Sequence, residues 1–195
     1  MFPNYKAGIE MNVYDFDGTI YNGDSTIDFW VYCLKKHPKI LCALPSTAGA
    51  FLLFKLRICS RENFKERFYG FLKYIPNVSS TVYAFWDIHM GNIKDFYRRG
   101  RRDGDVVISA SPEFLISEVC RRLGVACIAS KVNPATGKLE GPNCRGEEKV
   151  RRFREVYTGM QIQEFYSDST SDIFMAREAQ AAFLVTNNII KNWSV

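Results

Sequence analysis

Two acidic residues near the start of the chain have a spacing that suits chemistry on an anionic substrate. Asp15 and Asp17 follow a short apolar run at 11–14, and Gly18 and Thr19 predict a turn after them. Side chains two residues apart on an extended backbone point to the same side, so both carboxylates can meet one substrate. Two like charges this close repel each other unless a cation joins them, which implies a divalent metal ion.

Later segments also end in small polar or acidic residues. The apolar stretch at 106–109 ends at Ser109, and Asp168 follows another apolar stretch. The carboxyl ends of parallel strands lie on one edge of a sheet, where open α/β sheets bind ligands. Lys149, early in a predicted helix, adds an ammonium group, and Asp172 adds a carboxylate. Phosphoryl transfer needs such a set, because its catalysis is mainly positioning and electrostatic stabilisation.

These residues resemble the four motifs of the haloacid dehalogenase superfamily of phosphatases. The matching segments, in order, are D-F-D-G-T (15–19), V-V-I-S (106–109), Lys149 in G-E-E-K-V, and S-D-S-T-S-D (167–172). Ser167 stands where the commoner fourth motif has glycine. The long insert after the first motif is similar to the helical cap of the branch that contains phosphoserine phosphatase. The resemblance implies a Rossmann-like core and magnesium-dependent hydrolysis of phosphomonoesters.

The resemblance also implies a role for each matching residue. Asp15 would attack phosphorus and form an aspartyl-phosphate. Asp17 would protonate the leaving oxygen and then deprotonate the water that releases phosphate. Ser109 would hydrogen-bond a phosphoryl oxygen, and Lys149 would neutralise the nucleophile and the phosphate. The residues expected to hold magnesium are Asp15, Asp17 through its backbone carbonyl, Asp168, and Asp172 directly or through water.

The second carboxylate favours phosphate esters over halides as substrates. True dehalogenases of the superfamily lack an acid two residues after the nucleophile. An alkoxide leaving group needs a proton and a halide does not, so Asp17 points to ester hydrolysis.

The substrate itself is less defined, and we expect a small phosphorylated metabolite. The expected substrate-binding residues are Asp24, Arg67, Gly18 and Ala110. Asp24 stands nine residues after Asp15, where phosphoserine phosphatases place a glutamate that holds the substrate's amino group. Those enzymes follow the second-motif serine with glycines, whereas Ala110 follows here. An apolar, aromatic-rich cap equally suits a lipid headgroup or another bulky phosphate ester.

The elements that must position these residues alternate between strands and helices outside one long insert. Strands are predicted at 11–15, 106–109, 125–129, 162–167 and 182–186. Helices are predicted at 25–36, 39–57, 60–74, 79–99, 112–123, 146–157 and 171–181, with a hairpin over 131–144. The alternation predicts an α/β fold with a parallel sheet and helices on both faces. The core would comprise 1–22 and 103–195, and an all-helical cap would comprise 23–102.

Composition favours a cytoplasmic enzyme. The 195 residues carry a net charge of +5, and the six cysteines form no C-x-x-C pair that would indicate zinc or a disulfide framework. Residues 1–8 lack the apolar run of a signal peptide. The arginines at 98–102 are interpreted as a solvated helix end. Nucleic acid is not an expected partner, because no aromatic residues interleave with them.

The most hydrophobic window, 40–54, is interpreted as a buried or interfacial helical segment. It has no charge, but it is short for a membrane span and Pro45 interrupts it. Contact with a bilayer surface stays open as an alternative, because Lys and Arg residues flank the window: Lys35, Lys36, Lys39, Lys55 and Arg57.

Two other classes of function remain as alternatives to a phosphatase. A phospho-accepting domain like a bacterial receiver also combines acids, a hydroxyl and a lysine at parallel strand ends, although it would lack the long insert. A catalytically idle binding domain is the other. Repeated phosphate release distinguishes an enzyme from both. The sequence leaves the oligomeric state open.

Overall fold

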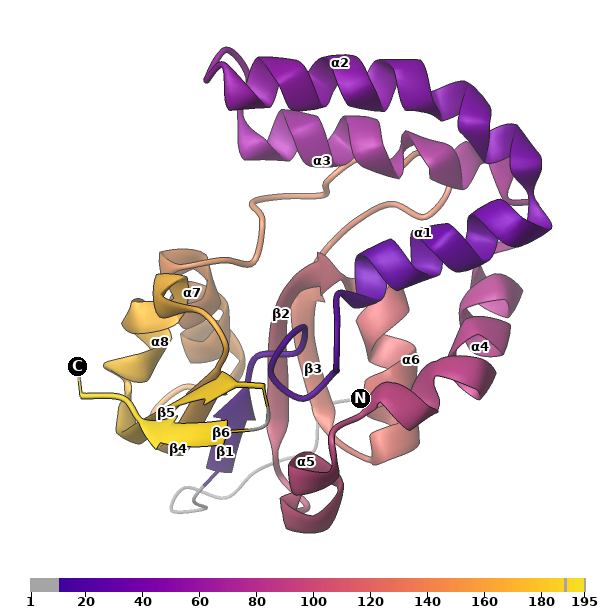
Figure 1. The fold of residues 1–195 in the computed structure, drawn as a ribbon. Coiled ribbons are helices and arrows are strands. Elements are labelled where there is room, and N and C mark those ends of the chain that lie inside the picture. The colour runs from indigo at the N-terminus through magenta and orange to yellow at the C-terminus, as the bar shows by residue number, and fades with distance from the viewer. Residues whose placement is uncertain (1–10, 188, 195) are drawn as a thin grey trace.

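The strands form one sheet at the centre of the molecule (Figure 1). The structure is a computed structural model that describes residues 11–187 and 189–194. In the order in which they pair, the described strands are β3 (Ala126–Ser130), β2 (Val106–Pro112), β1 (Met11–Tyr14), β4 (Ile162–Ser167), β5 (Ala179–Thr186) and β6 (Ile189–Asn192). The strands β1 to β5 run parallel, and β6 is antiparallel to β5. The predicted α/β class and parallel sheet are confirmed.

Helices cover both faces of this sheet. The described α-helices are α1 (Ser25–Lys36), α2 (Leu44–Lys55), α3 (Arg61–Tyr69), α4 (Val78–His89), α5 (Asp95–Gly100), α6 (Glu113–Leu123), α7 (Glu147–Val156) and α8 (Ile173–Ala176). The short 3₁₀ segments are η1 (Pro38–Ala43), η2 (Gly70–Tyr74), η3 (Met90–Asn92) and η4 (Thr170–Asp172).

Alternating side chains on the strands divide the core into two apolar clusters. Tyr14 packs in one cluster with Leu115 of α6. Its neighbour Val13 packs in the other cluster with Phe153 of α7 and Met175 of α8. Successive residues of a strand point to opposite faces, so α6 lies on one face of the sheet and α7 with α8 on the other.

The insert between β1 and β2 contains α1 to α5 and is helical throughout its regular elements, as predicted. Asp24, Ser60 and Asn77 accept backbone N–H groups and fix the starts of α1, α3 and α4. The predicted helix 79–99 is interrupted by η3, where Gly91 weakens helical continuation. The first apolar cluster contains residues of both the insert and the predicted core, so the domain boundaries stay a prediction.

The two ends of the insert are joined by backbone hydrogen bonds. The N–H of Asn22 donates to the carbonyl of Asn92 at 2.8 Å, and the N–H of Lys94 donates to the carbonyl of Ile20 at 2.8 Å. The Lys94 ammonium also donates to the carbonyl of Gly18. We call this the neck of the insert; it closes the loop that follows β1.

Further sequence predictions, nearer the C-terminus, also differ from the structure. The predicted helix 171–181 is wrong after residue 176, because Ala179 pairs with Ile162 of β4 and begins β5. Its alanine-rich sequence has a high helix propensity that strand pairing overrides. Strand β6 was not predicted. The expected hairpin at 131–144 has one antiparallel bridge, between Val132 and Leu139.

No helix among the described residues has the length and apolar character required to cross a bilayer. This includes α2, which lies in the hydrophobic window. The predicted lack of a signal peptide concerns residues 1–8, which lie outside the described residues.

Candidate active site

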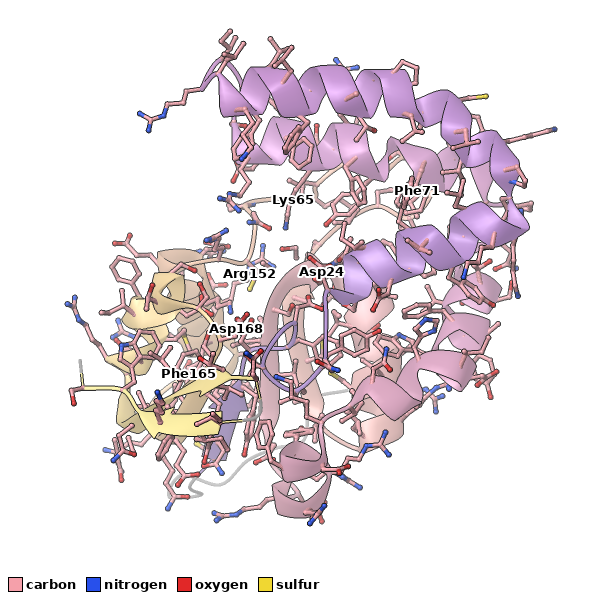
Figure 2. All side chains as sticks on the ribbon, viewed as in Figure 1. Asp24, Lys65, Phe71, Arg152, Phe165 and Asp168 are labelled. Carbon is pink, nitrogen blue, oxygen red and sulfur yellow. The ribbon has the colours of Figure 1, made fainter. Side chains whose placement is uncertain are left out.

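The carboxyl ends of β1, β2 and β4 bring together side chains that are distant in the sequence. Asp15 follows β1, Ser109 lies in β2, and Asp168 follows β4. All three line one cavity of about 380 Å³, together with residues of the insert. Figure 2 shows Asp168 near the strand ends, with Asp24 at the start of α1 and Lys65 below α3 on the side of the insert.

Lys149 holds two carboxylates at the floor of this cavity. Its ammonium donates to Oδ1 of Asp15 at 2.6 Å and to Oδ2 of Asp172 at 2.7 Å, and the lysine is buried. Ser167 adds a hydrogen bond to the same Oδ2 at 2.9 Å. Burial alone would lower the pKa of Lys149, but the two carboxylates outweigh it and raise that pKa. The lysine is therefore a permanent cation beside Asp15.

Asp17 lies in a different environment from Asp15. The backbone N–H of Ser25 donates to its Oδ1 at 2.6 Å, and the Ser111 hydroxyl donates to its Oδ2. Burial, followed by the charge of Asp24, raises the pKa of Asp17 to about 6, although these hydrogen bonds oppose the rise. A carboxyl group with such a pKa can exchange protons near neutral pH, as a general acid must.

Asp168 is tied to the loop that follows Asp15. Its N–H donates to the Thr19 hydroxyl at 2.8 Å. Its carboxylate lies so close to Gly18 that a Cβ atom at that position would be 2.1 Å from Oδ2, and Gly18 has a φ of +72°. Only glycine suits both conditions. The first and fourth motifs therefore meet through Gly18 and Thr19.

The oxygen atoms near Asp168 suit magnesium, a hard cation that often uses one or two carboxylates together with other oxygens. Across residues 11–187 and 189–194, no three acidic, histidine or cysteine side chains are grouped to enclose a metal on their own. Asp168 nevertheless lies against the residue that follows Asp17, and Asp15 lines the same cavity. Burial and the charge of Asp172 raise the pKa of Asp168, so added positive charge would stabilise its ionised form. The carboxylates of Asp15 and Asp168, which line one cavity, are oxygen ligands of the kind that fits such an ion.

One face of α3 lines the cavity from the insert. Arg61, Phe64, Lys65 and Phe68 follow the helical i, i+3, i+4, i+7 spacing and all line it. The Lys65 ammonium donates to the Ala110 carbonyl at 2.7 Å and to Oδ1 of Asn143 at 2.7 Å. Burial, followed by the charge of Arg61, lowers the pKa of Lys65 to about 8.

The predicted substrate-binding residues have different outcomes. Asp24 and Ala110 line the cavity. Gly18 lies next to Asp168, which lines the cavity. The structure places Arg67 elsewhere, in a groove on another side of α3. The reason is geometric: Arg67 is two residues from Lys65, and residues two apart on a helix face different directions. Helical spacing from Arg61, four residues before, and Phe68, three residues after, would have favoured Lys65.

Sequence reasoning also missed Ser111 and Arg145. The helix predicted at 112–123 would make Ser111 its N-cap, but Ser111 belongs to β2, and α6 begins at Glu113 without a side-chain cap. Its hydroxyl instead holds Asp17, and it accepts a hydrogen bond from Thr26 at 3.0 Å. Arg145 lines the cavity from the loop before α7. No sequence signal separates it from the other arginines of the chain.

Comparisons with known proteins give a relative and two similar folds. Protein CicA of Caulobacter vibrioides (strain NA1000 / CB15N) is 32% identical over 77 residues, a match that covers 36% of this chain and 35% of CicA. The chain thus matches about a third of the length of this curated relative.

Two solved structures resemble the whole chain. A protein of unknown function from Bordetella pertussis Tohama I has a TM-score of 0.71 at 20% identity, over 90% of each chain. A phosphoserine phosphatase with an analogue of its phospho-aspartyl intermediate has a TM-score of 0.55 at 18% identity, over 89% of this chain and 84% of that one. At these identities the likeness shows a shared fold.

The family of this chain is shown by a match of its sequence to a protein family. The sequence of residues 13–177 matches the family of haloacid dehalogenase-like hydrolases, and this range includes all four predicted motifs. The same motifs meet at one cavity in the structure. The chain belongs to the haloacid dehalogenase-like hydrolase family.

Proposed function

We propose that this protein is a magnesium-dependent phosphomonoester hydrolase that forms an aspartyl-phosphate on Asp15. The observation that carries the proposal is the buried group in which the Lys149 ammonium lies 2.6 Å from Asp15 and 2.7 Å from Asp172. A fixed cation at this position reduces the repulsion between an anionic nucleophile and an anionic phosphate.

Asp15 and Asp17, the two carboxylates of the first motif, have different roles in the reaction. Oδ of Asp15 forms a bond to phosphorus while the bond from phosphorus to the ester oxygen breaks, and Asp17 gives its proton to that oxygen. Asp17 then takes a proton from water, whose oxygen attacks phosphorus and breaks the bond to Asp15. The hydrogen bonds from Ser25 and Ser111 hold Asp17 in one orientation for both transfers.

Asp15, Asp168 and the carbonyl of Asp17 would hold magnesium, with Asp172 directly or through water. When bound, magnesium supplies positive charge that draws the phosphoryl oxygens toward the nucleophile. Ser109 lines the cavity where a hydroxyl can donate to a phosphoryl oxygen.

The walls of the cavity favour a small substrate that carries a second anionic group. Arg61, Lys65 and Arg145 are among the residues that line the cavity, and Asp24 adds a negative charge to the same lining. A phosphorylated amino acid or hydroxy acid has a carboxylate that complements the cations. Phosphoserine also has an amino group that complements Asp24, so it belongs first in a substrate screen.

We also propose a cytoplasmic location. All six cysteines are free. Six cysteines without a disulfide are typical of a protein in a reducing compartment such as the cytoplasm.

The test is phosphate release from a panel of phosphorylated metabolites and lipid headgroups in the presence of magnesium. The wild-type protein should release phosphate repeatedly, and Asp15→Asn should abolish turnover of every substrate while circular dichroism shows an intact fold. Asp103→Asn removes an exposed acid outside the cavity and should keep full activity. Turnover by Asp15→Asn would refute the assigned nucleophile, and a single phosphorylation without release would favour a receiver-like domain.

A further inference from the structure

The helix α2 presents apolar side chains to solvent on most of its surface. Only Ala50 is buried in this helix. Leu52 and Leu56 are each 60% exposed, and Ile58 in the following turn is 68% exposed. We call the exposed apolar residues of η1, α2 and this turn the cap ridge, which comprises Leu41, Leu44, Phe51, Leu52, Leu53, Leu56 and Ile58.

The cap ridge lies on the outermost helix of the insert. Figure 1 shows α2 at the top of the molecule, with α3 between it and the sheet. Phe51 and Phe54 pack on Phe64 of α3, with ring centroids 5.7 Å and 5.6 Å apart. The inner side of α2 is therefore anchored on α3. The remaining apolar side chains are held outward on a supported helix.

The stretch of sequence that contains the cap ridge carries only positive charges. Residues 29–61 contain six Lys or Arg residues and no Asp or Glu. The net charge of the whole chain is +5, and the net charge of this stretch is +6. The remainder of the chain therefore has a net charge of −1. The cations nearest the ridge in sequence, Lys39, Lys55 and Arg57, are exposed.

A groove beside α2 continues the same pattern. Its volume is about 670 Å³, and Ala50 and Leu53 line it on the side of α2. Arg67, Lys73 and Lys138 line it as well, and all three are exposed, whereas Glu66 is the one acid in its lining. Apolar groups and a net excess of cations thus lie next to each other in this groove.

From this arrangement we infer that the cap ridge binds the surface of a bilayer that contains anionic phospholipids. The helix α2 lies in the plane of the interface, with its leucines among the acyl chains and the flanking lysines and arginines at the headgroups. A second copy of this chain is a poor occupant, because it would bring the same positive stretch to the contact. This inference goes beyond the proposed function and does not depend on activity.

Vesicle co-sedimentation tests the inference. The wild-type protein should bind vesicles of phosphatidylcholine mixed with phosphatidylglycerol in equal parts more tightly than vesicles of phosphatidylcholine alone. Lys39→Gln/Lys55→Gln should weaken binding to the mixed vesicles by about 20-fold, since each cation near an anionic surface contributes about fivefold. Leu52→Ser/Leu56→Ser should weaken it by at least about tenfold through lost apolar burial.

Matched variants change the same residue types away from the ridge. Ile88→Ser/Ile189→Ser removes apolar side chains that are 67% and 58% exposed on α4 and β6. Arg99→Gln/Lys191→Gln lowers the net charge by the same amount as the lysine variant. Both controls should bind mixed vesicles within about twofold of wild type, and all four variants should keep the wild-type melting temperature.

Three outcomes would overturn the inference. The first is a wild-type protein that does not bind mixed vesicles. The second is equal weakening by the ridge variants and their controls, which would indicate unspecific attraction. The third is a dimer in light scattering that Leu52→Ser/Leu56→Ser converts to a monomer, because a second copy would then cover the ridge.

Discussion

Asp15 and Asp17 are two residues apart in the sequence, yet their contacts make them chemically different. Asp15 accepts from a permanent cation, Lys149, whereas Asp17 accepts from the neutral donors Ser25 and Ser111. Burial raises the pKa of Asp15 to about 7 and that of Asp17 to about 6, but only Asp15 has a cation beside it that favours its ionised form. The contact with Lys149 therefore suits Asp15 to the proposed role of nucleophile.

Asp17→Asn should slow hydrolysis of alkyl phosphates by about 10²–10⁴-fold, the usual cost of a lost general acid. The loss should be much smaller with p-nitrophenyl phosphate, whose leaving group needs no proton. Measurement of kcat/KM for both substrates checks this. An equal loss for the two would contradict the assigned role.

Gly18→Ala should displace Asp168, because the new Cβ would be 2.1 Å from its carboxylate oxygen. The magnesium concentration that gives half-maximal activity should rise by about 10–100-fold, as for other losses next to a metal ligand. A magnesium titration of phosphate release measures it. Gly49→Ala is the control, since nothing lies within 4 Å of its Cβ, and it should titrate like wild type.

For individual residues, the sequence predicts the site residues that lie at strand ends or in the motifs, and few others. Asp15, Ser109 and Asp168 follow apolar runs, so the parallel sheet brings them to one edge, and motif order adds Lys149 and Asp172. Arg145 comes from a loop whose path depends on tertiary packing, which no local pattern encodes.

Among the elements, the loop at 131–144 connects the sheet to the insert. Leu139 donates its N–H to the Glu66 carboxylate of α3 at 3.0 Å, and Lys65 reaches Asn143 at 2.7 Å. The loop turns at Gly137, which has a φ of +74°. This contact with α3 helps to fix the wall of the cavity.

Gly137→Ala should destabilise the protein by on the order of 2 kcal/mol or more. Its Cβ would be 2.5 Å from the Tyr69 carbonyl oxygen, and the left-handed backbone adds about 1–2 kcal/mol of strain. Urea unfolding measures the loss. Gly141→Ala, with a φ of +114° but nothing within 4 Å, carries only backbone strain. Equal losses in both variants would argue against the contact with Tyr69.

Element types were predicted well where burial and propensity agree. Apolar runs that end in a polar or acidic residue predicted β1, β2 and β4. The segment 177–181 was assigned to a helix because alanine, arginine and glutamate favour helices, whereas pairing with β4 decides its structure. The strand β6 was missed because all four of its residues are exposed, so no alternation marks it.

For the whole molecule, one buried acid couples stability to pH. Asp105 is buried just before β2 and accepts the N–H of Arg102 at 2.9 Å. Burial raises its pKa to about 6 even though this hydrogen bond and nearby arginines lower it. Its stabilising contribution is complete below the unfolded pKa, near 4, and is lost as pH rises through about 6.

Asp105→Asn should therefore gain stability relative to wild type as pH rises. An amide keeps an acceptor for the Arg102 N–H and has no proton to lose. The difference in unfolding free energy between variant and wild type should increase by on the order of 2 kcal/mol from pH 4 to pH 7. Urea unfolding at both values measures it, and a difference that does not change with pH would exclude Asp105 as the cause.

The closed neck between Asn22 and Asn92 has an evolutionary consequence. The neck directly follows the segment that carries Asp15 and Asp17, and it is closed by its own backbone hydrogen bonds, whatever length of chain lies beyond it. Insertions and deletions between α1 and α4 would change what covers the cavity and leave the neck intact. Selection can thus remodel substrate preference in this lineage while the reaction chemistry is inherited unchanged.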